Sequence, residues 1–221
     1  MGKVVLSWSG GKDCAMALYE IQCSKEYAVT ALLTTITRDY DRISMHGVRR
    51  ALLERQAESA GLPLIKVFIP ANCTDKIYAE IMEKEMNRLK AEGINTVAFG
   101  DIFLQDVREY RENNLAKVGM KAIFPLWGRN SQELVTSFIN LGFQAIITTV
   151  DLRQLSKEFC GSMINNAFLG ALPQDVDPAD ENGEFHSFVF DGPVFKNGIR
   201  FSVGEKVLRD GFWFCDLLPV D

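Results

Sequence analysis

The sequence has few of the residues that build disulfide frameworks and metal clusters. Its five cysteines are scattered and odd in number, none is spaced as C-x-x-C, and only two histidines occur in 221 residues. Closely spaced ligands for a zinc site are therefore missing, and cysteines of this kind are typical of a reducing compartment. No apolar run approaches the roughly 20 residues that a membrane-spanning helix needs, and no signal peptide precedes the first glycine loop. We expect a soluble, cytoplasmic protein with no membrane partner.

An excess of basic residues is also missing. The chain has 24 lysines and arginines against 29 aspartates and glutamates, so its formal net charge is −5. This argues against affinity built on a broad basic face, as in most nucleic-acid binders, and leaves only a local basic groove open. The composition, with 47% hydrophobic and 24% charged residues, is that of a globular protein. The length suits one sizeable domain, or one domain with a small second lobe.

Two common nucleotide-binding loops are absent as well. The chain has no G-x-G-x-x-G, and a P-loop would need another glycine where Val5 and Leu6 stand. Instead, a β-like run at residues 4–8 leads into Ser9-Gly10-Gly11-Lys12-Asp13 and then into a helical stretch. The two glycines let the backbone approach an anion, and the helix start offers free N–H groups and a partial positive charge, to which Lys12 adds a full charge. This pattern predicts an anion site, although a tight turn between strand and helix would also explain it.

Short β-like runs alternate with amphipathic helical stretches over the first two thirds of the chain. Such an alternation implies right-handed crossovers and a doubly wound, mostly parallel sheet, whose ligands bind at the carboxyl ends of the strands. Asn130, followed by Glu133, predicts a capped helix start. Strands are expected at residues 4–8, 29–36, 64–69, 96–99, 122–126 and 145–150, and helices at 13–21, 48–60, 75–91, 104–118 and 130–139.

The last third of the chain has a different pattern. Residues 159–172 predict a helix, and residues 173–181 form an acidic loop. The turn signals Asp191-Gly192-Pro193, Asn197-Gly198 and Asp210-Gly211 then predict antiparallel hairpins. We therefore expect an α/β fold whose first domain spans residues 1–126, with a small C-terminal α+β lobe within residues 127–221.

The glycine loop resembles the S-G-G-x-D-S loop of the N-type ATP pyrophosphatases, in the adenine nucleotide alpha hydrolase-like superfamily. More narrowly, nearly the whole chain resembles the diphthine–ammonia ligase family. One departure is Cys14, where the family loop usually closes with Ser; a thiol is a weak donor, so Cys14 fits a small buried thiol at least as well as a phosphate ligand. The match rests on Trp8-Ser9-Gly10-Gly11-Lys12-Asp13, Gly100-Asp101-Ile102, Tyr110-Arg111-Glu112-Asn113, Pro125-Leu126-Trp127, Glu181-Asn182-Gly183-Glu184-Phe185-His186 and Asp191-Gly192-Pro193.

The resemblance implies a HUP-like fold in which residues 1–126 form an ATP-binding PP-loop domain and residues 127–221 a substrate-binding region. Asp13 would orient Mg²⁺ or its waters, or serve only as a helix-start residue. Arg111 would bind phosphate or carboxylate, or form a surface ion pair with Glu109 or Glu112. Adenine is expected near the backbone of residues 34–36. The implied ATP-binding residues are Ser9, Gly10, Gly11, Lys12, Asp13, Thr34, His46, Gly100 and Asp101.

The implied reaction is an ATP-dependent ligation. A carboxylate would be adenylated with release of pyrophosphate, and ammonia would then form the amide. Asn182, Glu184 and His186 become the residues on the acceptor side, with Glu184 or His186 taking a proton, although an Asn-Gly hairpin turn explains the same segment.

The resemblance implies diphthine on elongation factor 2 as the acceptor and diphthamide as the product. An unidentified small carboxylic acid is the alternative. Transfer-RNA thiolation typically needs cysteine pairs, which the chain lacks, and a non-enzymatic ATP-binding module fits the full set of motifs less well. The oligomeric state stays open, with a homodimer as one option.

Overall fold

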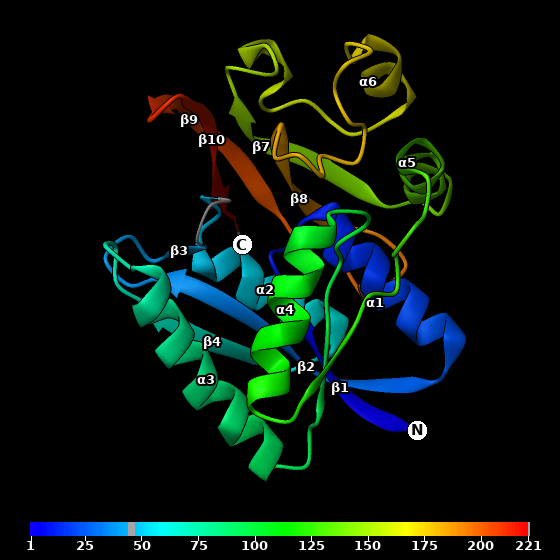
Figure 1. Cartoon of the computed structure of the whole chain (residues 1–221). Coiled ribbons are helices and arrows are strands. Elements are labelled where there is room, and N and C mark those ends of the chain that lie inside the picture. Colours follow the sequence, from blue (N-terminus) through cyan, green and yellow to red (C-terminus); the bar gives the residue numbers. More distant parts are fainter. Residues whose placement is uncertain (44–46, 221) are drawn as a thin grey trace.

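The chain forms two sheets in a computed structural model that describes residues 1–43 and 47–220. The first sheet has the order β3-β2-β1-β5-β6, with β4 also paired to β2 (Figure 1). All its neighbouring strands are parallel except β2 and β3. This confirms the predicted doubly wound, mostly parallel class. The strands are β1 (Gly2–Ser7), β2 (Tyr27–Thr37), β3 (Arg42–Ile43), β4 (Leu64–Ile69), β5 (Thr96–Ala98) and β6 (Lys121–Ile123).

Helices cover both faces of this sheet. Successive residues of a strand point to opposite sides, so the side chains of one strand pack in two different clusters. Val4 and Leu6 of β1 pack in one hydrophobic cluster with α1 (Lys12–Ser24) and α2 (Arg50–Ala60). Val5, between them, packs in a second cluster with α3 (Asp75–Ala91) and α4 (Gln105–Lys117). Burial on both faces explains why this strand is an unbroken apolar run in the sequence.

The helix ends follow local signals that the sequence displays. The Asn130 side chain accepts a hydrogen bond of 3.0 Å from the Glu133 N–H, which confirms the capped start of α5 (Ser131–Asn140). Helix α2 stops at Gly61, whose φ of +70° is a left-handed conformation that glycine adopts without strain. Of the described helices, none is both long and apolar enough to cross a membrane.

The second sheet is antiparallel, with the order β8-β7-β10-β9, and forms the small C-terminal lobe. Figure 1 shows it above the parallel sheet, with β8 next to α1. Ile146 and Phe188 of this lobe belong to the same hydrophobic cluster as the α1 face of the first sheet, so the two parts share a core. Its elements are β7 (Gln144–Asp151), the 3₁₀ turn η1 (Lys157–Phe159), α6 (Asn166–Ala171), β8 (Phe185–Asp191), β9 (Phe201–Arg209) and β10 (Phe212–Pro219).

The expected sixth parallel strand was assigned to the wrong sheet. Residues 145–150 do form a strand, but as β7 it pairs antiparallel with β8 and β10. All but the first residue of β7 are buried, and a buried apolar run shows only that both faces are covered. The partner strands come from much later in the chain, so no local pattern could identify them.

Two further expectations for the last third need correction. The helix predicted at residues 159–172 is interrupted, because Gly161 has φ +85° and a new helix starts only after Asn165. Of the three expected hairpins, only Asp210-Gly211 joins paired neighbours, β9 and β10. The other two turn signals lie between β8 and β9, which are at opposite edges of the second sheet.

Candidate active site at the glycine loop

The glycine loop lies between the end of β1 and the start of α1, as the sequence predicts. Gly10 has φ +84°, and a Cβ there would lie 2.7 Å from the Gln56 Oε1. A Cβ on Gly11 would lie 3.2 Å from the carbonyl oxygen of Ser187 in β8. The positive φ and the short contact favour glycine at position 10, whereas a side chain at position 11 would be tight against Ser187, in addition to any need for an anion to approach.

Gln56 of α2 is a fully buried amide that braces this loop. Its Oε1 accepts a 2.9 Å hydrogen bond from the Trp8 indole N–H. Its Nε2 donates to the carbonyl oxygens of Gly10 at 3.0 Å and Val189 at 2.6 Å. The Val189 N–H also donates to the Gly10 carbonyl at 2.9 Å. Sequence reasoning missed Gln56, whose only signal is an amide on the apolar side of an amphipathic helix.

The C-terminal lobe also contacts the start of α1 directly. The Lys12 backbone N–H donates to the Ser187 Oγ at 3.2 Å. The Lys12 side chain is only 3% exposed, with its Nζ 3.0 Å from the Asp13 Oδ2 and 3.9 Å from the Asp180 Oδ2. Burial alone would lower the pKa of Lys12, but the carboxylates of Asp13, Asp180 and Asp177 outweigh it and raise the pKa. Lys12 is thus a buried, permanently charged ammonium inside a ring of carboxylates.

The two carboxylate oxygens of Asp13 have different surroundings. Oδ2 pairs with Lys12, while Oδ1 is buried and has no hydrogen-bond partner among the described residues. Burial raises the pKa of Asp13 to about 6, against the opposing effect of Lys12. One free carboxylate oxygen beside the glycine loop would suit Mg²⁺, which takes few protein ligands and keeps phosphate oxygens and waters. Within residues 1–43 and 47–220, no group of three His, Cys, Asp or Glu side chains could hold a metal by itself.

Cys14 has the geometry of a small buried thiol. Its Sγ donates to the Gly11 carbonyl at 3.1 Å and lies 3.6 Å from the Ser9 Oγ. Burial raises the pKa of Cys14 to about 11. A neutral thiol that donates to a carbonyl in the first turn of its own helix fits a small buried thiol better than a phosphate ligand.

Gly100 and Asp101 follow β5, and Gly100 lies against the start of α1. A Cβ on Gly100 would lie 2.9 Å from the Asp13 carbonyl carbon, so only glycine lets this loop lie against the start of α1. Asp101 pairs with Arg111, with 2.6 Å between Oδ2 and Nε and 2.9 Å between Oδ1 and Nη2. The predicted surface pair of Arg111 with Glu109 or Glu112 is therefore wrong. The Arg111 guanidinium also stacks on the Phe99 ring, 4.4 Å from its centroid.

The acceptor-side residues predicted from the sequence divide into two groups. Glu184 is buried, and its carboxylate accepts from the N–H groups of Asp177 at 3.0 Å and Asn182 at 3.1 Å and from the Asn182 Nδ2 at 3.0 Å. Glu184 and Asn182 therefore hold their own loop together, and the expectation that Glu184 or His186 takes a proton stays a prediction. His186 is different, because its Nδ1 lies 3.5 Å from the Asp180 Oδ2 next to Lys12.

Two acidic residues of this loop were missed as site residues. Glu181 accepts at Oε1 from the N–H groups of Ile102 at 2.7 Å and Phe103 at 3.1 Å, which ties the loop to the segment after β5. Asp180 lies between Lys12 and His186. Neither could be singled out from an acidic stretch without knowing what lies opposite.

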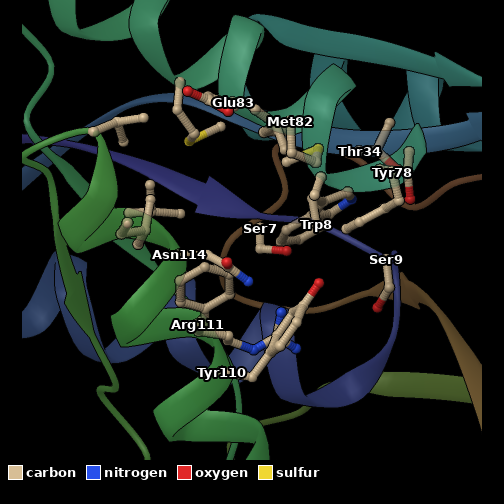
Figure 2. Close-up of a pocket in the computed structure, with 18 of the residues that line it drawn as sticks. Ser7, Trp8, Ser9, Thr34, Tyr78, Met82, Glu83, Tyr110, Arg111 and Asn114 are labelled. Atoms are coloured by element: carbon tan, nitrogen blue, oxygen red, sulfur yellow. The ribbon is translucent and has the colours of Figure 1, made fainter. Parts of the chain in front are cut away.

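A cavity of about 490 Å³ opens beside the glycine loop, between α3 and α4 (Figure 2). Ser9 and Trp8 line one end, and the side chains of Tyr78, Tyr110 and Arg111 face it from the two helices. Thr34 of β2 also lines it, and its buried Oγ1 has no partner among the described residues. The cavity volume is in the range of small-molecule sites. His46, also predicted for this site, lies outside the described residues.

A doubly wound sheet with S-G-G-K-D at the end of its first strand defines a HUP-like protein of the PP-loop class. The chain belongs to the diphthamide synthase family. The family model described as "Diphthamide synthase N-terminal domain" matches residues 2–122, and the "Diphthamide synthase C-terminal domain" matches residues 130–217.

Curated relatives carry the name diphthine–ammonia ligase. The protein of Danio rerio is 26% identical over 229 residues, covering 94% of this chain and 89% of its own. The Mus musculus protein is 25% identical over 230 residues, with 94% and 85% covered. The protein of Schizosaccharomyces pombe is 25% identical over 238 residues, which are 97% of this chain but only 38% of that longer protein.

Among solved structures, the U34-tRNA thiolase NcsA from Methanococcus maripaludis with its [4Fe-4S] cluster is a partial match. It has 20% identity and a TM-score of 0.39, covering 62% of this chain and 55% of that one.

Proposed function

We propose that this protein is an ATP-dependent ligase that adenylates a carboxylate, releases pyrophosphate and transfers ammonia to the activated acyl group. One observation carries the proposal: a cavity of about 490 Å³, lined by Thr34 of β2, reaches Ser9, the first residue of the glycine loop that leads from β1 to the buried Lys12. Family membership and relatives named diphthine–ammonia ligase support the same reaction.

The chemistry requires activation of the acceptor. A free carboxylate does not react with ammonia, because the departing group would be oxide. Attack of the carboxylate oxygen on the α-phosphorus forms an acyl-adenylate and breaks the bond to pyrophosphate. Ammonia then displaces AMP from the acyl carbon, and the amide nitrogen loses a proton. The enzyme has to stabilise negative charge on the leaving pyrophosphate and to accept that proton.

We place the phosphates of ATP against Ser9 to Asp13 and the adenosine in the cavity. Lys12 and the N–H groups at the start of α1 would stabilise charge on the pyrophosphate, since they are fixed before the reaction begins. The adenine ring would lie near Thr34. The Thr34 hydroxyl has no partner among the described residues and suits a hydrogen bond to the polar edge of adenine. When bound, Mg²⁺ would neutralise phosphate charge at the free oxygen of Asp13.

On the acceptor side, we propose that His186 takes the proton. Its ring lies close to Lys12, with only the carboxylate of Asp180 between them. Glu184 and Asn182 instead keep the loop in shape. By analogy with the relatives' name, the acceptor would be diphthine on elongation factor 2, with ammonia as the nitrogen donor. No contact in residues 1–43 and 47–220 favours a small-molecule carboxylate over it.

The products of ATP test the proposal. The purified protein is incubated with ATP, Mg²⁺, ammonium and elongation factor 2 carrying diphthine, and nucleotides are separated by chromatography. We expect AMP and pyrophosphate in equal amounts. In Lys12→Met, the rate should be lower than the wild-type rate by a factor of about 100 or more. Lys3→Met, an exposed lysine in β1, is the matched control and should retain the wild-type rate. Accumulation of ADP and phosphate would overturn the adenylation mechanism.

A further inference from the structure

Asp180 has an unusual backbone conformation. Its φ is +63°, in the left-handed region that non-glycine residues rarely occupy, and its side chain is 7% exposed. Oδ1 accepts a hydrogen bond of 2.6 Å from the Phe185 N–H, which fixes the direction of the carboxylate. Such strain persists only where the surrounding structure enforces it, and it concentrates at functional sites.

The other oxygen of Asp180 lies between two groups from opposite ends of the chain. Oδ2 is 3.9 Å from the Lys12 Nζ in the glycine loop and 3.5 Å from the His186 Nδ1 in β8. The titratable groups around this point are Lys12, Asp13, Asp177, Glu181 and His186. One carboxylate thus touches both the cation assigned to the phosphates and the imidazole assigned to the acceptor.

We propose that Asp180 is a positioning residue that aligns His186 with Lys12, and so sets the acceptor side of the site relative to the phosphate side. This inference rests on the proposed function for its catalytic consequence. An Nδ1–H directed at Asp180 makes Nε2 the nitrogen that carries the lone pair, so the carboxylate selects the tautomer able to take a proton. A negative charge this close to an anion site opposes ATP binding, which indicates a role other than holding the nucleotide.

Two variants separate positioning from folding. Asp180→Asn keeps the size and can still accept from the Phe185 N–H, but it removes the charge facing Lys12 and His186. Asp180→Gly removes the side chain and relieves the left-handed strain, so it stays informative if the Asn variant folds poorly. Asp175→Asn is the matched control, because Asp175 is an exposed carboxylate of the same acidic loop.

Three measurements decide. Calorimetric titration with α,β-methylene-ATP should show affinity that is not weaker than wild type in either Asp180 variant. The kcat for AMP formation should fall about 10-fold or more, since loss of a general base costs about 10²- to 10⁴-fold, while KM for ATP does not rise. Imidazole ¹⁵N spectra should show a proton on His186 Nδ1 in wild type and a shift toward the Nε2–H tautomer in Asp180→Asn. With only two histidines in the chain, each signal is assigned by replacing one of them.

The control should match wild type in all three measurements. Wild-type kcat, or an unchanged tautomer, in both Asp180 variants would overturn the inference, and so would a loss of nucleotide binding. The spectra need no acceptor, so they test the inference even if AMP formation fails and the proposed function falls.

Discussion

Replacing Gln56 with leucine should destabilise the protein and the ATP site together. Leucine is close in size, so the change removes hydrogen bonds without opening a large cavity. The Trp8 indole N–H loses its 2.9 Å acceptor, and the Val189 carbonyl loses its 2.6 Å donor. The Gly10 carbonyl keeps the N–H of Val189 as a partner.

The magnitude follows from these two buried groups. Each one left unpaired costs about 1–3 kcal/mol, so the free energy of unfolding should fall by roughly 2–6 kcal/mol. For a chain of this length each kcal/mol shifts Tm by about 2–4 °C, which gives a decrease of roughly 4–24 °C. ATP affinity should fall as well, since Gln56 orients the loop carbonyl at Gly10.

Urea unfolding and calorimetric titration with ATP measure the two effects. Gln105→Leu is the control, because Gln105 is exposed and its Nε2 bonds only the Glu109 side chain, at 2.8 Å. It should change stability by less than about 0.5 kcal/mol. If Gln56→Leu kept both the wild-type unfolding midpoint and the wild-type ATP affinity, the bracing role of this amide would be refuted.

Three other outcomes are expected. Gly100→Ala places a Cβ 2.9 Å from the Asp13 backbone and should weaken ATP binding in a titration, whereas Gly170→Ala, with no atom within 4 Å, should not. Glu184→Gln replaces a carboxylate that accepts three hydrogen bonds by an amide, and the free energy of unfolding in urea should fall by about 1–3 kcal/mol. Wild-type stability together with a loss of turnover would instead favour a role for Glu184 as a base. The pKa of Asp13 is about 6 in the folded protein and 3.8 for an ordinary aspartate, so the folded state binds more protons between these pH values and its stability falls as pH rises through this window. Asp13→Asn should abolish this dependence of the free energy of unfolding on pH, and a dependence that persists would contradict the raised pKa of Asp13.

Local patterns in the sequence were sufficient to predict the strand–loop–helix unit at the start of the parallel sheet. The apolar run, the two glycines and the helical period after them predict a strand, a loop and a helix within about twenty residues. Helix ends were also readable, as at Asn130 and Gly61, because capping depends on neighbours in the chain. The family resemblance added the association of the glycine loop with residues 181–186.

The tertiary structure decided how that C-terminal segment is used. Glu184 and His186 are two residues apart, yet one carboxylate is consumed by its own loop while the imidazole points at a group beside Lys12. Asp180 and Gln56 have no distinguishing sequence pattern, since Lys12 lies more than 40 residues from Asp180, and Trp8 more than 40 from Gln56. Hydrogen bonds and ion pairs act over a few ångströms in space, so the role of a polar side chain depends on which distant segment the fold places against it.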